Sequence, residues 1–185
     1  MNFLGRKITE HRNRQIPIQD EQPENTEIHV GSELNSLKIY SPAAGTIIPL
    51  QQVSDEVFKN EIVGKGIGIL PELPAIYSPV NGIVKYIPKT KHAVLVLSED
   101  GMQVLIHIGI DTVNLKGQFF KSIVQMNDKV QVGDKLIQFN LKEIKGLGYS
   151  TVIPVVITNS SEYSRVEVTR KERIGVSDCL IDVFK

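Results

Sequence analysis

The feature that most constrains this chain is an internal repeat. The segment IYSPAAGTI at residues 39–47 recurs as IYSPVNGIV at residues 76–84, an offset of 37 residues. In each copy, a proline that presets φ and a glycine flank a two-residue turn between strand-like arms. Gly45 and Gly82 can adopt the positive φ that closes such a turn. We therefore expect two related β-hairpins, packed face to face as a sandwich with pseudo-two-fold symmetry.

The rest of the chain after residue 38 is also typical of β-structure. Short apolar runs such as AVLVL, LIHIGI, TVIPVVIT and CLIDVF alternate with Gly, Pro, Asn or Asp, and no long segment has a helical period. The run KVQVGDKLIQF at residues 129–139 predicts a further hairpin around Gly133 and Asp134. The SPxxG turns followed by a VxxGD-type turn resemble the hybrid motif of biotinyl and lipoyl domains. We expect an all-β antiparallel sandwich of the barrel-sandwich hybrid type, with only short helical turns.

Two functions suggested by these motifs are disfavoured. Carrier domains of the hybrid-motif type present a modifiable lysine at a hairpin tip, and the candidate tips at residues 99–100 and 133–134 lack that setting. The run GKGIG at residues 64–68 suggests a phosphate loop, but it lacks the required spacing and the helix that follows. We interpret its glycines as structural residues in a bulged strand.

Charge and composition exclude several classes of partner and location. The 185 residues carry 21 Lys and Arg against 21 Asp and Glu, so the chain has no global field that attracts nucleic acid. No apolar run approaches the roughly 20 residues that cross a bilayer, and no secretory segment follows the first methionine. A lone cysteine cannot form an internal disulfide. We expect a cytoplasmic protein that does not bind nucleic acid.

The neutral total conceals a polarised N-terminal region. Residues 1–16 carry a net charge of +3, and residues 17–37 carry five acids and no Lys or Arg. This region lacks sustained apolar periodicity, so we expect a flexible tail over residues 1–37 and one domain over residues 38–185. Residues 1–14 could form a short basic amphipathic helix, which predicts at most weak membrane contact.

Two of the four histidines fall in one predicted hairpin. If the ends of the SEDG turn at residues 98–101 are opposed, His92 lies opposite His107. Residues directly opposite each other share a face, with Cβ atoms about 4.5–5.5 Å apart. A bulge at Gly101 would instead shift the register by one residue and place the two rings on opposite faces.

Two adjacent imidazoles predict a chemical site. Like charges at short distance depress each other's proton affinity, so at least one ring stays neutral at physiological pH. A neutral imidazole has a free ring nitrogen that can act as a nucleophile or a metal ligand. Thr90 shares the predicted strand face of His92 and can fix its ring, and backbone carbonyls near Gly109 can do the same for His107.

The motifs around these histidines resemble a known family. The run LIHIGIDTVNLKGQFF, with TKHA fifteen residues before its histidine and IVGKGIGI further upstream, closely resembles the IIA component of the glucose family of the bacterial phosphoenolpyruvate-dependent sugar phosphotransferase system. The resemblance extends over roughly residues 36–185 and includes the SPxxG turn, the VGD turn and TVIPVVITN.

The resemblance implies a phosphocarrier, a phosphotransferase component that needs no cofactor. His107 would be phosphorylated on Nε2 by the histidine-containing phosphocarrier protein, and would pass the group to a cysteine of the IIB domain of a sugar permease. His92 would hydrogen-bond the phosphoryl group, and Thr90 would orient His92. A rim for partner binding is also implied, formed by Val57, Phe58, Ile62, Val63, Asp111 and Val113.

Two further functions are weighed against this one. His107 and Asp111 form HIGID, similar to the HxGxD ligand pair of lysostaphin-type zinc peptidases, but the second HxH motif of those enzymes is absent from the chain. The resemblance also implies a regulator, whose unphosphorylated form binds permeases or kinases. With a carboxylate from such a partner, His92 and His107 would complete an intermolecular zinc site.

Overall fold

The computed structural model describes residues 36–185. The tail predicted for residues 1–37 and the membrane contact predicted for residues 1–14 lie outside the described residues, except for Ser36 and Leu37, which begin the first strand. Within residues 36–185, no helix has the length and apolar character that a bilayer crossing requires.

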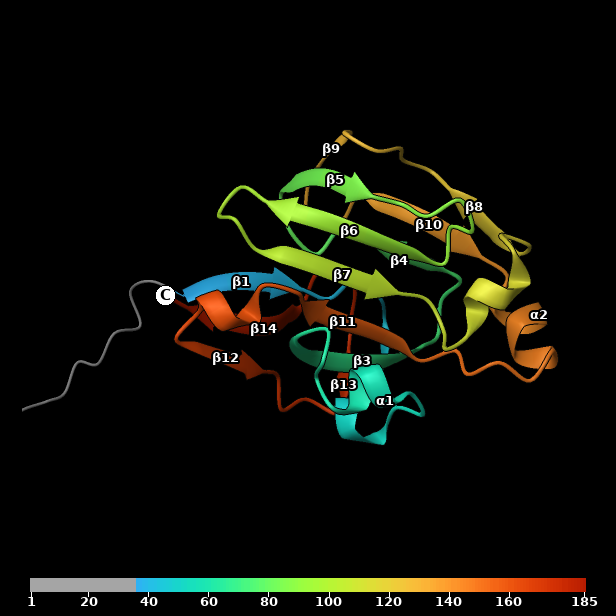
Figure 1. The fold of residues 1–185 in the computed structure, drawn as a ribbon, viewed down its shortest axis with the longest axis horizontal. Coiled ribbons are helices and arrows are strands. Elements are labelled where there is room, and N and C mark those ends of the chain that lie inside the picture. The colour runs from blue at the N-terminus through green and yellow to red at the C-terminus, as the bar shows by residue number, and fades with distance from the viewer. Residues whose placement is uncertain (1–35) are drawn as a thin grey trace, which may run out of the picture. The chain divides into compact units, whose positions relative to one another are not determined.

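Three antiparallel sheets make up the described domain (Figure 1). The largest has eight strands, in the order β13 (Arg173–Ile174), β2 (Gly45–Ile48), β3 (Lys65–Pro71), β11 (Ile153–Ile157), β7 (Gln103–His107), β6 (Ala93–Ser98), β5 (Gly82–Tyr86) and β9 (Lys129–Val130). One three-stranded sheet contains β1 (Ser36–Tyr40), β14 (Cys179–Phe184) and β12 (Arg165–Val168). The other contains β4 (Ala75–Tyr77), β10 (Lys135–Phe139) and β8 (Phe120–Ser122).

Helical structure among the described residues is limited to short elements. They are α1 (Glu56–Lys59), α2 (Leu141–Gly146) and the 3₁₀ turns η2 (Leu50–Gln52), η3 (Thr112–Leu115) and η4 (Ser160–Glu162). The prediction of an all-β sandwich with only short helical turns is confirmed.

The two SPxxG turns contact each other symmetrically. The N–H of Tyr40 donates to the carbonyl of Pro79, and the N–H of Tyr77 donates to the carbonyl of Pro42, both at 2.9 Å. In each copy, the buried serine hydroxyl donates to the carbonyl two residues further on, at 2.6 and 2.7 Å. These matched contacts are the pseudo-two-fold symmetry that the repeat predicts.

A second, more divergent repeat completes this symmetry and was not predicted. The segments VGDKLI (132–137) and VSDCLI (176–181) each place their second residue in the left-handed region, with φ of 89° for Gly133 and 65° for Ser177. The aspartate that follows accepts a hydrogen bond from the backbone N–H three residues before it, at 2.8 and 3.1 Å. Its carbonyl accepts from the serine N–H of one SPxxG turn, at 2.7 Å in both copies. Each turn is therefore held by a segment distant in the sequence.

The predicted hairpins at these turns are wrong. Strands β1 and β2, which flank the first SPxxG turn, lie in different sheets, as do β4 and β5 at the second and β9 and β10 at the VGD turn. The two arms of each turn separate because the turn forms its hydrogen bonds with a distant repeat segment and not between its own arms. Neither Gly45 nor Gly82 has positive φ. Glycine is needed there because a Cβ would collide with the carbonyl of Leu70 or Leu97 on the neighbouring strand.

The GKGIG run is part of a regular strand. Its residues from Lys65 onward belong to β3, which pairs with β2 and β11 without a register shift, so the predicted bulge is wrong. A Cβ at Gly66 would collide with the carbonyl oxygen of Val155. The glycines therefore have a structural role, as predicted. They are needed because the neighbouring strand approaches β3 closely, and not because of a bulge.

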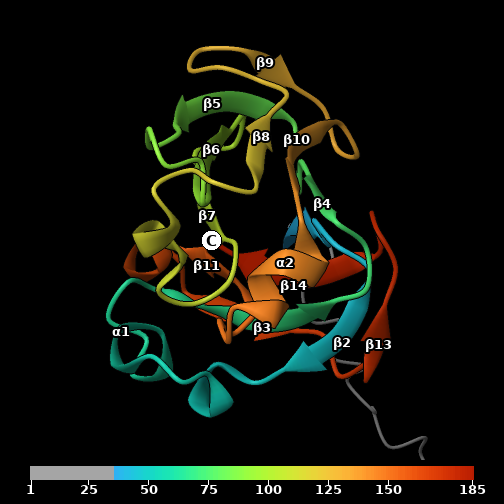
Figure 2. The same cartoon turned by 90° about the vertical axis from the view of Figure 1, so that its right-hand side faces the viewer.

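The large sheet separates two apolar clusters. The main core lies between the sheets, with Val155 among its fully buried residues. The next residue, Val156, points to the opposite face and joins a smaller cluster with Leu50, Val53, Phe58 and Ile110. Figure 2 shows α1, which carries Phe58, lying beside β3 and β11. The outer face of the sheet therefore has its own apolar layer, on which the histidines lie.

Candidate functional site

The two histidines are not opposite each other in the sheet. His107 ends β7, and its partner across the sheet is Ala93. Gly101, with φ of 92°, lengthens the turn between β6 and β7 by one residue and shifts the register. The predicted opposition of His92 and His107 is therefore wrong, and the bulge that was its alternative is present.

The rings meet nevertheless. The ring centroids of His92 and His107 lie 4.8 Å apart with an angle of 72° between the ring planes. His92 precedes β6, and Lys91 before it has a left-handed backbone with φ of 55°. Because the chain turns at Lys91, the alternation of strand faces does not apply to His92. An irregular turn, and not the strand register, brings the two imidazoles together.

Backbone contacts hold the ring of His107. Its Nδ1–H donates to the carbonyl oxygen of Gly109 at 2.6 Å, as the sequence predicts, so the lone pair is left on Nε2. Gly109 has φ of 74°, and a Cβ there would lie 2.6 Å from a methyl carbon of Thr112 and 2.7 Å from the carbonyl oxygen of Ser150. Only glycine fits at the residue that fixes the ring.

The loop after His107 is anchored at both ends. The buried hydroxyl of Thr112 donates to the carbonyl of Ile108 at 2.6 Å. The N–H groups of Gly109 and Ile110 donate to the carbonyls of Val152 and Ser150, at 3.1 and 3.0 Å. The carbonyl that accepts from His107 is therefore preorganised.

Both imidazoles favour the neutral form. Burial lowers the pKa of His107, and this effect is opposed by the hydrogen bond to Gly109 and by the negative charges of Asp55 and Asp111. Burial and the proximity of His107 lower the pKa of His92 to about 4. At neutral pH both rings are uncharged.

A side chain holds the ring of His92. The Oγ1 of Thr90 lies 2.6 Å from Nδ1 of His92. A turn closed by the N–H of Lys91 on the carbonyl of Pro88, at 2.8 Å, includes Thr90. When the hydroxyl donates to Nδ1, the neutral ring carries its proton on Nε2. The predicted contact between Thr90 and His92 is therefore confirmed.

Helix α1 adds an aromatic neighbour that depends on a residue missed by the predictions. Asp55 precedes α1, and its carboxylate accepts from the N–H groups of Val57 and Phe58 at 2.8 and 3.0 Å. The capped turn places the ring of Phe58 edge-on to His107, with centroids 5.4 Å apart. An aspartate directly before Glu-Val-Phe is an N-cap signal that could have identified Asp55.

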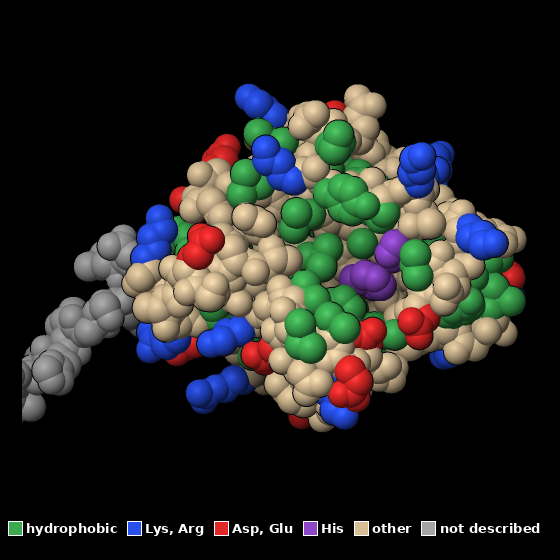
Figure 3. All heavy atoms as spheres, viewed as in Figure 1, with side chains coloured by type: hydrophobic (Ala, Val, Ile, Leu, Met, Phe, Trp, Pro, Cys, Tyr) green, Lys and Arg blue, Asp and Glu red, His purple; other side chains and the backbone are tan. Residues whose placement is uncertain are grey.

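The predicted rim divides into exposed and buried members. The side chains of Val57, Ile62 and Val113 are 43%, 71% and 46% exposed, and Asp111 is exposed as well. Phe58 is only 6% exposed, and Val63 packs against the smaller cluster. Figure 3 shows the histidines in a hollow bordered by hydrophobic side chains, with acidic side chains to one side.

The sheet next to His107 adds two apolar residues that were not predicted. Leu95 and Leu105 are directly paired, two residues along from the pair of Ala93 and His107, and both are partly buried. A period of two places all four residues on one face. The hollow is thus continuous with an apolar face of the sheet. Among residues 36–185, no cluster of three or more His, Cys, Asp or Glu could hold a metal ion.

Curated relatives of this chain are named as components of a PTS system. It is 42% identical over 143 residues to the PTS system beta-glucoside-specific EIIBCA component of Bacillus subtilis, covering 77% of this chain and 24% of that protein. It is 38% identical over 167 residues to the beta-glucoside-specific EIIBCA component of Halalkalibacterium halodurans, covering 90% and 26%. The chain thus spans about a quarter of the length of these curated relatives.

The fold and the family model agree with these relatives. The solved glucose permease IIA from Mycoplasma capricolum aligns with a TM-score of 0.74 and 33% identity, covering 80% of this chain and 96% of that one. The family model of the phosphoenolpyruvate-dependent sugar phosphotransferase system, EIIA 1, matches residues 37–163. Since this match covers more than half of the chain, the chain belongs to the EIIA 1 family, whose members are phosphotransferase components of sugar uptake.

Proposed function

We propose that this chain carries a phosphoryl group during sugar uptake. Nε2 of His107 accepts the group from the histidine-containing phosphocarrier protein and passes it to the IIB domain of a sugar permease. The observation that carries this proposal is the 2.6 Å hydrogen bond from Nδ1 of His107 to the carbonyl of Gly109. With the proton held on Nδ1, the Nε2 lone pair can attack phosphorus without a general base.

The transfer is a displacement at phosphorus. A bond forms from Nε2 of His107 to phosphorus while the donor's N–P bond breaks, through an in-line, metaphosphate-like transition state. The lowered pKa of His107 supports this step because a neutral ring needs no deprotonation. The phosphorylated ring gains positive charge, which Asp55 and Asp111 favour from nearby. Onward transfer breaks the same bond.

His92 assists through a hydrogen bond and not through a charge. With its pKa near 4, it is neutral at pH 7. If the hydroxyl of Thr90 donates to Nδ1, then Nε2–H of His92 can donate to a phosphoryl oxygen. Negative charge is spread over the transferring group in the transition state, so a preorganised donor next to it lowers the barrier.

Successive partners bind over the same apolar surface. The exposed side chains of Val57, Ile62 and Val113 surround the histidines, and such a patch suits transient protein contacts. Asp111 adds a charge that can pair with cations of a partner. Partners of this kind place the domain in the cytoplasm. Two relatives are named for beta-glucosides, so a β-glucoside is the first sugar to test in an uptake assay.

The same surface supports a regulatory role for the unphosphorylated form. Neutral His92 and His107 are both competent zinc ligands, although phosphoryl transfer itself needs no cofactor. A zinc ion there would take its remaining protein ligand from a bound partner, such as a carboxylate. The rival zinc-peptidase function predicts instead peptide hydrolysis that a chelator abolishes.

The proposal is tested by phosphorylation of the full chain. Incubation with phosphoenolpyruvate, enzyme I and the phosphocarrier protein should add one acid-labile phosphate to His107, located by mass spectrometry. His107→Ala should abolish this label, and His29→Ala, a substitution before the described residues, serves as the matched control. Label on another residue would refute the assignment.

A further inference from the structure

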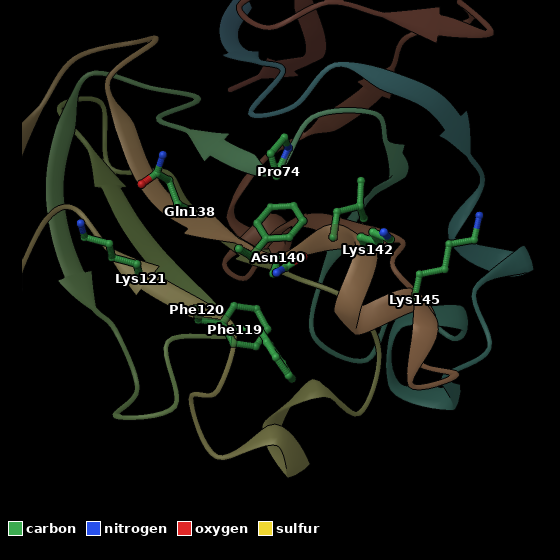
Figure 4. Close-up of a pocket in the computed structure, with 10 residues that line it drawn as sticks. Pro74, Phe119, Phe120, Lys121, Gln138, Asn140, Lys142 and Lys145 are labelled. Atoms are coloured by element: carbon green, nitrogen blue, oxygen red, sulfur yellow. The ribbon is translucent and has the colours of Figure 1, made fainter.

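A second site opens between β8, β10 and α2. This cavity has a volume of about 780 Å³, within the range of small-molecule sites, about 300–1,000 Å³. It includes none of the residues that hold or surround the histidines. It is lined by Pro74, Phe119, Phe120, Lys121, Gln138, Phe139, Asn140, Leu141, Lys142 and Lys145 (Figure 4).

Three aromatic rings contribute to the apolar wall of the cavity. Phe120 on β8 pairs directly with Phe139 on β10, and their side chains are 7% and 5% exposed. Phe119 is half-buried, and Figure 4 shows it on the opposite side of the cavity from Pro74. An apolar body that enters the cavity would contact these rings.

The backbone of Phe119 is strained. Its φ is 73°, in the left-handed region that a bulky residue rarely adopts and that glycine adopts freely. The N–H of Asn140, at the start of α2, donates to the carbonyl of Phe119 at 2.9 Å and holds this conformation. Strain of this kind is found preferentially at binding sites. A phenyl ring in a position suited to glycine therefore indicates a role for the ring.

The charges at the cavity have one sign. Lys121 lies on one side and Lys142 and Lys145 on the other, and no Asp or Glu lines the cavity (Figure 4). None of the three lysines forms an ion pair with a carboxylate of residues 36–185. Flexible ammonium groups at the edge of an apolar cavity complement a ligand with an anionic head.

We propose that this cavity binds a soluble amphipathic anion, a small molecule with an apolar body and one carboxylate or phosphate-type head group. The body lies against Phe119, Phe120 and Phe139, and the lysines bind the head. A soluble ligand fits better than a membrane surface, because the two most buried rings cannot reach into a bilayer. The site is independent of phosphoryl transfer by His107.

Titration of the ¹⁵N-labelled full chain with octanoate, followed by NMR, tests the proposal. Octanoate should bind saturably and shift the amides of residues 119–121 and 138–142. Octanol, which has the same apolar chain without the charge, should bind about tenfold more weakly, a difference typical of one lost charge-assisted contact. Equal affinity for the two molecules, no saturable binding, or shifts centred on His92 and His107 would overturn the proposal.

Two variants separate the roles of the ring and the charges. Phe119→Gly relieves the strained φ but removes a ring that packs against the main core, so its two effects on Tm oppose each other, while octanoate affinity should fall about tenfold through lost apolar contact. Lys142→Gln combined with Lys145→Gln should weaken octanoate and leave octanol unchanged. Tyr86→Ala removes an exposed aromatic ring outside the cavity and should change neither affinity. Unchanged octanoate affinity in Phe119→Gly would refute the site.

Lipid vesicles distinguish a soluble anionic ligand from the anionic head groups of a membrane. The full chain should not co-sediment with phosphatidylglycerol vesicles through this cavity. Sedimentation that Phe119→Gly abolishes, without saturable octanoate binding by the unaltered chain, would replace the soluble ligand with a lipid surface and so overturn the proposal.

Discussion

The two histidines of the site are held in contrasting ways. His107 ends a regular strand, and its ring is fixed by the carbonyl of Gly109 at 2.6 Å in a loop with several backbone hydrogen bonds. His92 follows an irregular turn, and its ring is fixed by the side chain of Thr90, also at 2.6 Å. A carbonyl can only accept, so it sets the tautomer of His107 permanently. A hydroxyl can donate or accept, so the proton of His92 can adjust during the proposed phosphoryl transfer.

Because a backbone carbonyl fixes His107, we expect Gly109→Ala to cause the largest loss of stability and of phosphate uptake. The Cβ would clash with Thr112 and Ser150 at a φ of 74°, so the loop must move and the ring of His107 loses its acceptor. We expect a loss of about 2–4 kcal/mol in the free energy of unfolding, typical of a strained backbone combined with a clash. Denaturant titration measures the loss, and phosphate uptake by His107 should fall in parallel.

Gly101→Ala is the matched control for this substitution. Gly101 also has positive φ, at 92°, but a Cβ there has nothing within 4 Å. Its cost should be limited to backbone strain, about 1–2 kcal/mol, and uptake should not change. Equal loss of stability and uptake in the two variants would show that the carbonyl of Gly109 has no special role.

His92→Gln should separate the two halves of the reaction. The variant keeps the nucleophile His107 and its acceptor, so phosphate uptake should persist. Onward transfer to the IIB domain should fall by about 100-fold, the typical cost of a lost transition-state donor. Single-turnover transfer from the phosphorylated variant measures this step. Equal impairment of uptake and transfer would show that His92 assists both steps alike and does not separate them.

Thr90→Val should have a smaller effect of the same kind. The substitution keeps the shape of the side chain but removes the hydroxyl that sets the proton of His92. Onward transfer should fall about tenfold, the value of one typical hydrogen bond. Thr158→Val is the control, because that exposed hydroxyl has only long contacts with Gln103, at 3.3 and 3.4 Å. A Thr90→Val protein that transfers at the normal rate would remove Thr90 from the mechanism.

A further expected effect, on stability and not on transfer, is a pH dependence that His92 contributes. Its pKa is about 4 in the folded protein, below the ordinary value of 6.5, so the unfolded chain binds a proton more readily. Stability is therefore fully present above pH 6.5 and falls as the pH decreases toward 4. Denaturant midpoints measured across this window should decline less in His92→Gln than in the unaltered chain. Parallel declines would contradict the lowered pKa.

Sequence reasoning predicted that His92 and His107 are neighbours, but through a strand pairing that is wrong. It correctly predicted the proximity of the rings and the contacts with Thr90 and a carbonyl near Gly109. It opposed His92 and His107 in the strands, whereas Ala93 is the partner of His107. The one-residue bulge at Gly101 and the left-handed Lys91 offset each other. The bulge was the alternative register that the sequence left open, whereas Lys91 has no sequence signal because Lys rarely adopts positive φ.

Turns were easier to locate than to interpret. The SPxxG and VGD turns occur where predicted, but their arms lie in different sheets. Whether two arms pair with each other depends on long-range hydrogen bonds, such as those between the two SPxxG turns. The second repeat was missed because Ser177 stands where its counterpart has Gly133, which hides the shared left-handed turn.

The sequence by itself determined the chemistry available to this protein, because residue types and local spacing survive folding unchanged. The repeat, the short β-rich runs and the motif around His107 were sufficient for the fold class and the family. Only the tertiary structure decided the burial, the neighbours and the orientation of the reactive side chains. Desolvation of His107, the 4.8 Å approach of His92 and the edge-on contact of Phe58 come from segments far apart in the chain. Their packing has no local signal, since burial and register depend on the whole domain.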